Sequence, residues 1–154
     1  MYLLFIFFPL ISSFFSGFLG KQLGSFGSIR FSVFCILNSF LISIFFIFEI
    51  IFLKIPFIYL ELFYWIDSDI LNIKWSFLFD NLTVIMSFIV TFISFLVHLY
   101  SIEYMNHDPH LNRFMSYLSL FTFFMIILIT GDNFLQLFLG WEGVGICSYL
   151  LISF

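Results

Sequence analysis

Residues 133–154, NFLQLFLGWEGVGICSYLLISF, form an apolar run with one charged residue, Glu142. A run of this length crosses a bilayer as an α-helix, because only internal hydrogen bonds can satisfy the backbone there. The helical rise from Asn133 places the Glu142 carboxyl roughly 13 to 14 Å below the surface of the apolar layer, near its middle. An acid at that depth is costly and is by default a candidate for function. Glu142 is therefore the predicted site residue.

The composition of the whole chain sets its class. Of 154 residues, 63% are hydrophobic and 9% are charged, whereas soluble domains carry about 25% charged residues. The apolar runs are continuous, unlike the alternating segments of about ten residues in outer-membrane barrels. We therefore predict an all-α integral membrane protein with one membrane domain at residues 1–154. The lipid bilayer is its expected surrounding, and the net charge of -4 gives no reason to expect a nucleic acid partner.

Five apolar runs predict five membrane-spanning helices, at residues 2–19, 31–53, 81–100, 114–130 and 133–154. A glycine-rich turn should follow the first run, and Pro56 should end the second because proline cannot continue a helix. Asp80 is a predicted N-cap for the third helix, and Asp132 or Asn133 for the fifth. The aromatic connection at residues 55–79 suits either a belt at headgroup level or a short hairpin.

The basic residues indicate an orientation. The first loop carries Lys21 and Arg30 and no acid, whereas the second carries Lys54 and Lys74 among several acids. The positive-inside rule counts Lys and Arg in short loops, so the compact first loop is placed inside. The N-terminus then lies outside and residue 154 at the inner face. Asp67 and Asp69 are expected to be exposed.

Coding bias suggests where the protein is made. The chain has 28 Phe and no Ala, which indicates an AT-rich genome, and no basic leader precedes the first apolar run. We expect an organelle-encoded protein without a secretory signal or transit peptide. Cys35 and Cys147 fall within different spans and are expected to pack as small apolar residues.

Two segments resemble a known family. Residues 107–117 (HDPHLNRFMSY) and 131–145 (GDNFLQLFLGWEGVG) are similar to the NADH dehydrogenase (ubiquinone) subunit 5 family, an antiporter-like membrane subunit of respiratory complex I. Asn112 stands where that family is expected to have proline. The resemblance covers the whole chain but only the first quarter of the usual family length. It implies three leading helices followed by the first two helices of an antiporter-like repeat.

The resemblance also implies a role for Glu142. In that family a glutamate on the fifth helix pairs with a lysine on a broken seventh helix in the first proton site, and only the glutamate has a counterpart here. All five basic residues lie at span ends or in loops: Lys21, Arg30, Lys54, Lys74 and Arg113. The lysine is therefore expected from a separately encoded remainder of the subunit, with which this chain would dock.

The activity implied is that of proton-translocating NADH:ubiquinone reductase in the mitochondrial inner membrane. Flavin, iron–sulfur clusters and quinone would belong to other subunits, so no cofactor or metal site is expected in this chain. Its partners would be the remainder of subunit 5 and other membrane-arm subunits.

Three alternatives compete with this interpretation. The chain could be a subunit of an Mrp-type cation/proton antiporter, which has a similar helix arrangement and glutamate. It could be a small multidrug carrier that works as a dimer, although the single acid then lies on the last span. It could also be a structural scaffold in which Glu142 is inert.

Other polar residues carry weaker hypotheses. Glu49 is expected to be partly solvated near a helix end. His98 could relay protons, but a satisfied interfacial histidine is favoured. His107, Asp108 and His110 are metal-type ligands, yet their loop favours capping and subunit contact.

Three glycines surround the acid in sequence. Gly140, Gly143 and Gly145 are predicted to be close-packing positions that let another helix approach the acid, because helix association in lipid relies on small residues.

Overall fold

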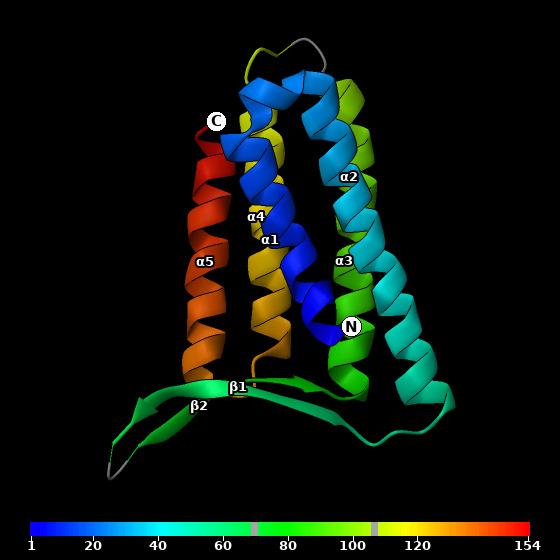
Figure 1. The fold of residues 1–154 in the computed structure, drawn as a ribbon, viewed down its shortest axis with the longest axis vertical. Coiled ribbons are helices and arrows are strands. Elements are labelled where there is room, and N and C mark those ends of the chain that lie inside the picture. Colours follow the sequence, from blue (N-terminus) through cyan, green and yellow to red (C-terminus); the bar gives the residue numbers. More distant parts are fainter. Residues whose placement is uncertain (69–70, 106–107) are drawn as a thin grey trace.

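The computed structural model describes residues 1–68, 71–105 and 108–154, without the side chains of Lys21, Leu23 and Ser25. The helices run alongside one another, and a β-hairpin crosses one end of them (Figure 1). In chain order the elements are α1 (Tyr2–Phe18), α2 (Gly20–Ile47), the π-helical segment η1 (Phe48–Phe52), β1 (Ile58–Asp67), β2 (Asn72–Phe79), α3 (Asn81–Tyr104), α4 (Leu111–Thr130) and α5 (Phe134–Ile152).

The mostly helical membrane fold is confirmed in outline. Within the described residues, four helical segments are long and apolar enough to cross a membrane: Phe26–Phe52, Asn81–Tyr104, Leu111–Thr130 and Phe134–Ile152. The remaining apolar helix, α1, has 17 residues and is about 25 Å long, slightly less than the ~30 Å of a typical apolar layer. Four candidate spans and one shorter apolar helix therefore correspond to the five predicted spans.

The predicted turn at residues 20–30 was wrong in extent. Helix α2 already begins at Gly20, and it is kinked at Gly24, whose φ of 72° suits a residue without a side chain. After this kink, Ser32 donates to the carbonyl of Ser28, and Ile29 is buried in a cluster with Met115. The contact of Ile29 with Met115 packs the start of this segment against α4.

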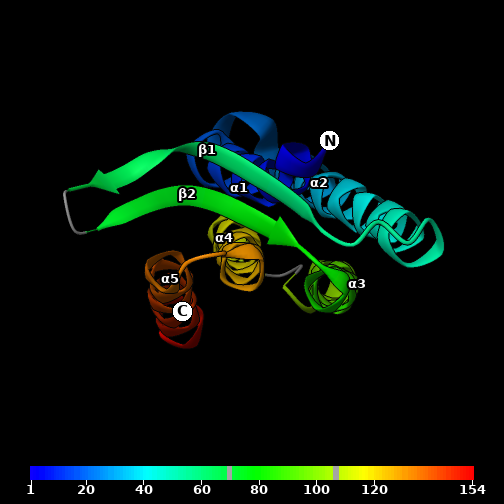
Figure 2. The same cartoon turned by 90° about the horizontal axis from the view of Figure 1, so that it is seen from below.

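The connection between the second and third helices contains a β-hairpin, so the expectation of an all-α chain was wrong for residues 58–67 and 72–79. Strands β1 and β2 pair antiparallel, with register shifts between Glu61 and Phe63 and between Tyr64 and Ile66. Aromatic and β-branched residues favour strands, and the hairpin was one of the two arrangements expected here. Figure 2 shows it lying across the ends of the helices.

The two strands are joined by side chains as well as by the backbone. Lys74 donates to Glu61 across them at 2.8 Å, and the Phe63 and Trp75 rings stack with centroids 6.0 Å apart. The hydrogen bond to Glu61 raises the pKa of the half-buried Lys74 ammonium. Asp67 is exposed as predicted, whereas Asp69 lies outside the described residues.

An aromatic cluster fills the bundle at the hairpin end. Phe5, Phe46 and Phe79 are completely buried, and the Phe46 ring lies 5.3 Å from each of the other two. The Tyr2 ring stacks on Phe46 at 4.6 Å. This cluster joins α1, α2 and the last residue of β2, so it anchors the hairpin to the helices.

Further from the hairpin, small hydroxyl residues line the helix contacts. Ser12 of α1 and Ser119 of α4 are hydrogen-bonded at 2.9 Å, and Ser116 donates to the carbonyl of Ser13 at 2.8 Å. Small residues let helix backbones approach closely in a membrane. Because the chain has no Ala, serine and glycine fill this role.

Asp80 caps α3, as predicted, and the cap is reciprocal. The Asp80 carboxylate accepts from the Thr83 amide at 2.8 Å, and the Thr83 hydroxyl accepts from the Asp80 amide at 2.7 Å. This reciprocal pair of hydrogen bonds, a capping box, also orients the chain as it passes from the hairpin into α3.

We expect Asp80→Ala to lower the free energy of unfolding by about 1 kcal/mol, because amides of the first turn of α3 lose their acceptor. Asp80→Asn keeps an acceptor oxygen and should retain most of the stability. Thermal unfolding of the two variants in the same detergent measures the difference, and equal losses would contradict the role of the cap.

Candidate functional site

Glu142 lies near the middle of α5, roughly 12 Å along the helix axis from Phe134 and roughly 15 Å from Ile152. Its side chain is exposed and borders a groove of about 490 Å³. The groove runs between α5, α4 and the hairpin, and the other residues that line it are Trp65, Phe124, Leu135, Phe138, Leu139, Gly143 and Ile146. None of these residues is basic.

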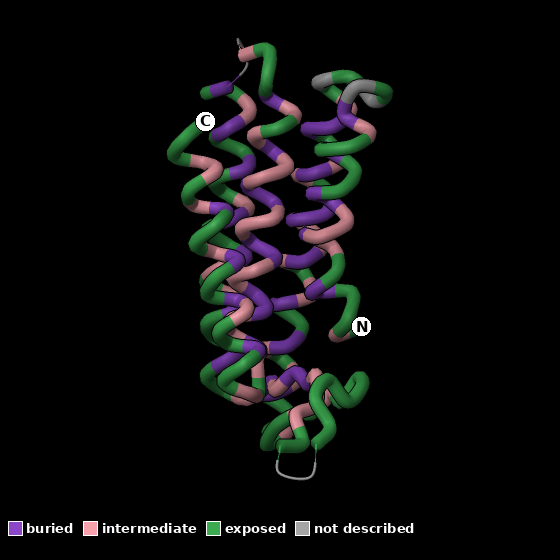
Figure 3. The backbone as a smooth tube through the Cα atoms, turned by 90° about the vertical axis from the view of Figure 1, so that its left-hand side faces the viewer, coloured by how far each residue is buried: buried purple, intermediate pink, exposed green. Residues whose placement is uncertain are grey.

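Helix α5 has two distinct faces at this level. Gly140, Gly143 and Cys147 are buried against the bundle, whereas Glu142 and Tyr149 are exposed on the opposite side. Helix α5 forms an outer edge of the bundle (Figure 1), and Figure 3 shows much of its outward side exposed. In this chain Glu142 therefore points outward and does not enter the bundle.

Two of the three predicted close-packing glycines contact α4. A side-chain carbon at Gly140 would lie 2.7 Å from the Cα of Leu128, and one at Gly143 would lie 2.2 Å from the Phe124 ring. At Gly145, by contrast, no atom lies within 4 Å of that position. Close packing is confirmed for Gly140 and Gly143, but their neighbour is α4 and not a helix that approaches Glu142, while Gly145 leaves open space on the outward side.

The start of α5 is tied to the hairpin. Asn133 occupies the N-cap position, but its side chain does not cap the helix. Its side-chain nitrogen Nδ2 instead donates to the carbonyl of Lys74 at 2.7 Å. Asp132 accepts from the Ser76 hydroxyl at 3.1 Å. The predicted side-chain cap was therefore wrong, because both candidates bind β2.

Gln136 also binds β2, and sequence reasoning did not find it. Its side-chain oxygen accepts from the amide of Ser76 at 3.3 Å, and the residue is 1% exposed. A glutamine within an apolar span was the signal that could have identified it, since a buried amide requires a partner.

His98 is satisfied, as expected, but it lies inside the bundle. Its ring is completely buried, with Nδ1 2.8 Å from the carbonyl of Ser94 and Nε2 3.2 Å from the Ser119 hydroxyl. The interfacial location was wrong because α3 continues to Tyr104. Helix α4 lies between α3 and α5 (Figure 2), so His98 and Glu142 belong to helices on opposite sides of it.

The other weak candidates occupy separate places. Glu49 is half-buried, as expected, and accepts a hydrogen bond from the phenol of Tyr2. Asp108 accepts from the amide of His110 at 2.8 Å, whereas His107 lies outside the described residues.

In the described part of the chain, the cysteines form no disulfide with each other and the potential metal ligands form no metal-binding cluster. Cys35 and Cys147 are both buried and free. No group of three or more His, Cys, Asp or Glu that could hold a metal ion occurs among the residues that the structure describes.

Comparison with known proteins tests the resemblance. Residues 65–115 match the family described as "NADH-Ubiquinone oxidoreductase (complex I), chain 5 N-terminus". All 154 residues align with NADH-ubiquinone oxidoreductase chain 5 from Arabidopsis thaliana at 56% identity and from Triticum aestivum at 55% identity, and this covers 23% of each relative. The chain 5 of Hypocrea jecorina is 53% identical over the same length, with 22% of it covered.

The chain matches the N-terminal part of NADH-ubiquinone oxidoreductase chain 5. The resemblance seen in residues 107–117 and 131–145 is thereby confirmed. The chain spans less than a quarter of the length of these chain 5 relatives. The aligned region includes Glu142 and all five helices.

We expect Gly140→Ala to destabilise the contact between α4 and α5 by about 1 to 3 kcal/mol, as other overpacked positions do. The backbone of Leu128 cannot move aside as a flexible side chain could. Gly145→Ala makes the same chemical change in open space and serves as the control. Thermal unfolding in detergent should show a loss for Gly140→Ala only, and equal stability of the two variants would contradict the packing.

Proposed function

We propose that this chain is the N-terminal part of a proton-pumping subunit 5 module of respiratory complex I in the mitochondrial inner membrane, and that Glu142 carries a proton in that module. The match to chain 5 supports the assembly. The observation that carries the role of Glu142 is its place at mid-helix on the outward face of α5, beside a groove without a basic residue.

The general behaviour of a carboxyl group in an apolar medium supports this role for Glu142. A carboxyl group in an apolar medium favours its neutral, protonated form unless a positive charge lies nearby. An ammonium group arriving within about 4 to 6 Å favours the carboxylate, and its withdrawal restores the proton. A small displacement of the partner cation therefore switches the acid between two protonation states.

The free energy of ionising Glu142 in the membrane is comparable to the energy needed to move a proton against the membrane potential. Moving one charge across a membrane potential of ~100 mV costs about 2.3 kcal/mol. Insertion scales assign a charged side chain at the centre of a membrane helix a cost of about 2.5 to 3.5 kcal/mol. The two energies are comparable, so control of the charge on Glu142 can be coupled to proton movement against the potential.

A separately encoded remainder of the subunit is proposed to supply the lysine. The outward face of α5 offers it a place, since Gly145 leaves space on the same side as Glu142. Electron transfer, with its flavin, iron–sulfur clusters and quinone, is assigned to other subunits. Other membrane-arm subunits would pack on the remaining apolar surfaces of this chain.

We propose the orientation from the charges at the two ends. Arg30 and Arg113 lie toward the end with the α3–α4 loop, and Lys21 is near the start of α2. The opposite, hairpin end carries Lys54 and Lys74. The positive-inside rule therefore favours the α3–α4 loop inside and the N-terminus outside.

We expect Glu142→Gln to retain electron transfer from NADH to quinone but to lower proton pumping several-fold, because an amide cannot carry the proton. The measurement uses the purified complex in sealed vesicles and records acidification for each NADH oxidised. Glu103→Gln, which neutralises an exposed acid outside the groove, is the control and should pump normally.

Unchanged pumping by an assembled Glu142→Gln complex would contradict the proton-carrying role. Co-purification of the wild-type chain tests the assembly separately. Only complex I would bring peripheral flavin and iron–sulfur polypeptides with it, whereas an Mrp-type antiporter would not.

A further inference from the structure

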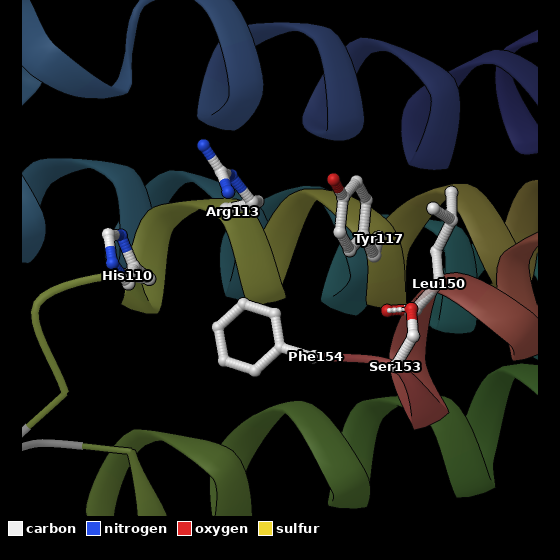
Figure 4. Close-up of a pocket in the computed structure, with 6 residues that line it drawn as sticks. All are labelled: His110, Arg113, Tyr117, Leu150, Ser153 and Phe154. Atoms are coloured by element: carbon white, nitrogen blue, oxygen red, sulfur yellow. Dashed lines mark hydrogen bonds between the residues drawn. The ribbon is translucent and has the colours of Figure 1, made fainter.

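Two adjoining hollows lie at the end of the bundle away from the hairpin. Their volumes are about 210 and 370 Å³, and His110, Arg113 and Tyr117 line both of them. Figure 4 shows these three side chains along α4, with Leu150 and Phe154 at the end of the chain nearby. The hollows are far along α4 from Phe124, which borders the groove at Glu142, so they form a separate site.

The polar lining suits an anion. Arg113 and His110 are exposed, Tyr117 is half-buried, and no acidic residue lines either hollow. Among the described residues the one ion pair is Lys74 with Glu61, at the opposite end of the molecule. A guanidinium presents a planar set of donors that matches the oxygens of a phosphate group. Arg113 is therefore available to a ligand from outside the chain.

The position of Arg113 on its helix adds to this preference. Helix α4 begins at Leu111, so Arg113 lies in the first turn, where backbone dipoles also favour negative charge. Arg113 and Tyr117 are four residues apart and share one side of the helix. Arg113, Tyr117 and His110 therefore line the same hollows from successive turns at the start of α4.

The rest of the lining combines the polar residues Asn112, Ser116 and Ser153 with apolar side chains that lie where the helices end. Phe18, the last residue of α1, borders one hollow and is 79% exposed. Leu150 and Phe154 border the other. A soluble anion gains nothing from these surfaces, whereas a lipid could place its phosphate at Arg113 and its acyl chains along them. Tyrosine and arginine at helix ends are typical of the membrane interface.

We propose that these hollows bind the phosphate headgroup of an anionic phospholipid, with Arg113 as its main electrostatic contact and Tyr117 and His110 as hydrogen-bonding groups. Basic pockets between membrane helices are a recognised kind of lipid site. The site is independent of proton transfer at Glu142, and it would hold lipid against the junction of α1 with α4.

The experiment uses the purified complex that contains the full chain, stripped of lipid by detergent and then incubated with phosphatidylcholine vesicles containing phosphatidylglycerol. Lipids that remain bound after a second purification are counted by native mass spectrometry. Wild type should retain phosphatidylglycerol, and Arg113→Gln should retain several-fold less.

Arg30→Gln removes an exposed arginine that does not line the hollows and should retain lipid like wild type. Arg113→Lys keeps the charge but loses the planar set of donors, so an intermediate loss is expected even if the glutamine variant does not assemble. Equal retention by Arg113→Lys, Arg30→Gln and wild type would overturn the proposal.

Two further measurements distinguish a bound lipid from a soluble anion or a protein segment in the hollows. Inorganic phosphate added at a concentration equal to that of the lipid should not displace phosphatidylglycerol, and full displacement would show a site for a soluble anion. A density map of the assembled complex should show a headgroup beside Arg113. A protein segment filling the hollow there would also overturn the proposal.

Discussion

The close contact of α4 with its neighbours determines most of this structure. On one side, Ser116 and Ser119 of α4 bind Ser13 and Ser12 of α1. On the other side, α5 approaches α4 through Gly140 and Gly143, where no side-chain carbon would fit without displacing α4 atoms. Lipid provides no hydrophobic force between helices, so such contacts between small residues must hold the bundle together.

These contacts fix the direction in which Glu142 points. Burial of Gly140 and Gly143 against α4 leaves the residues on the other side of α5 facing outward, and Glu142 is among them. The hairpin reinforces this rotation, since Asn133 and Gln136 at the start of α5 both bind β2. The orientation of the acid therefore depends on glycines in mid-helix and on polar bonds at the helix start.

The sequence predicted the elements better than their relations. It located Glu142 in a helix and Asp80 at a helix start, because length, apolar content and capping preferences are local properties. The sequence did not indicate which face of α5 is buried, because that helix is apolar around most of its surface. Hydrophobic residues on such a helix can pack against either lipid or protein. It missed Gln136 and the depth of His98 for a related reason: their partners, Ser76 and Ser119, lie far away in the chain.

The outward position of Glu142 has a consequence for assembly. An isolated charge is costly inside a membrane, so the proposed role of Glu142 requires a cation close to its carboxyl group. In the proposed assembly, a second helix on this face would exclude lipid and would bring the cation that favours the carboxylate. Gly145 lies on the same side and leaves space for close approach, and Trp65 and Phe124 line the groove beside Glu142. In the function proposed above, Glu142 is one half of a charge pair, and the close packing of α5 on α4 through Gly140 and Gly143 fixes its position along the helix bundle.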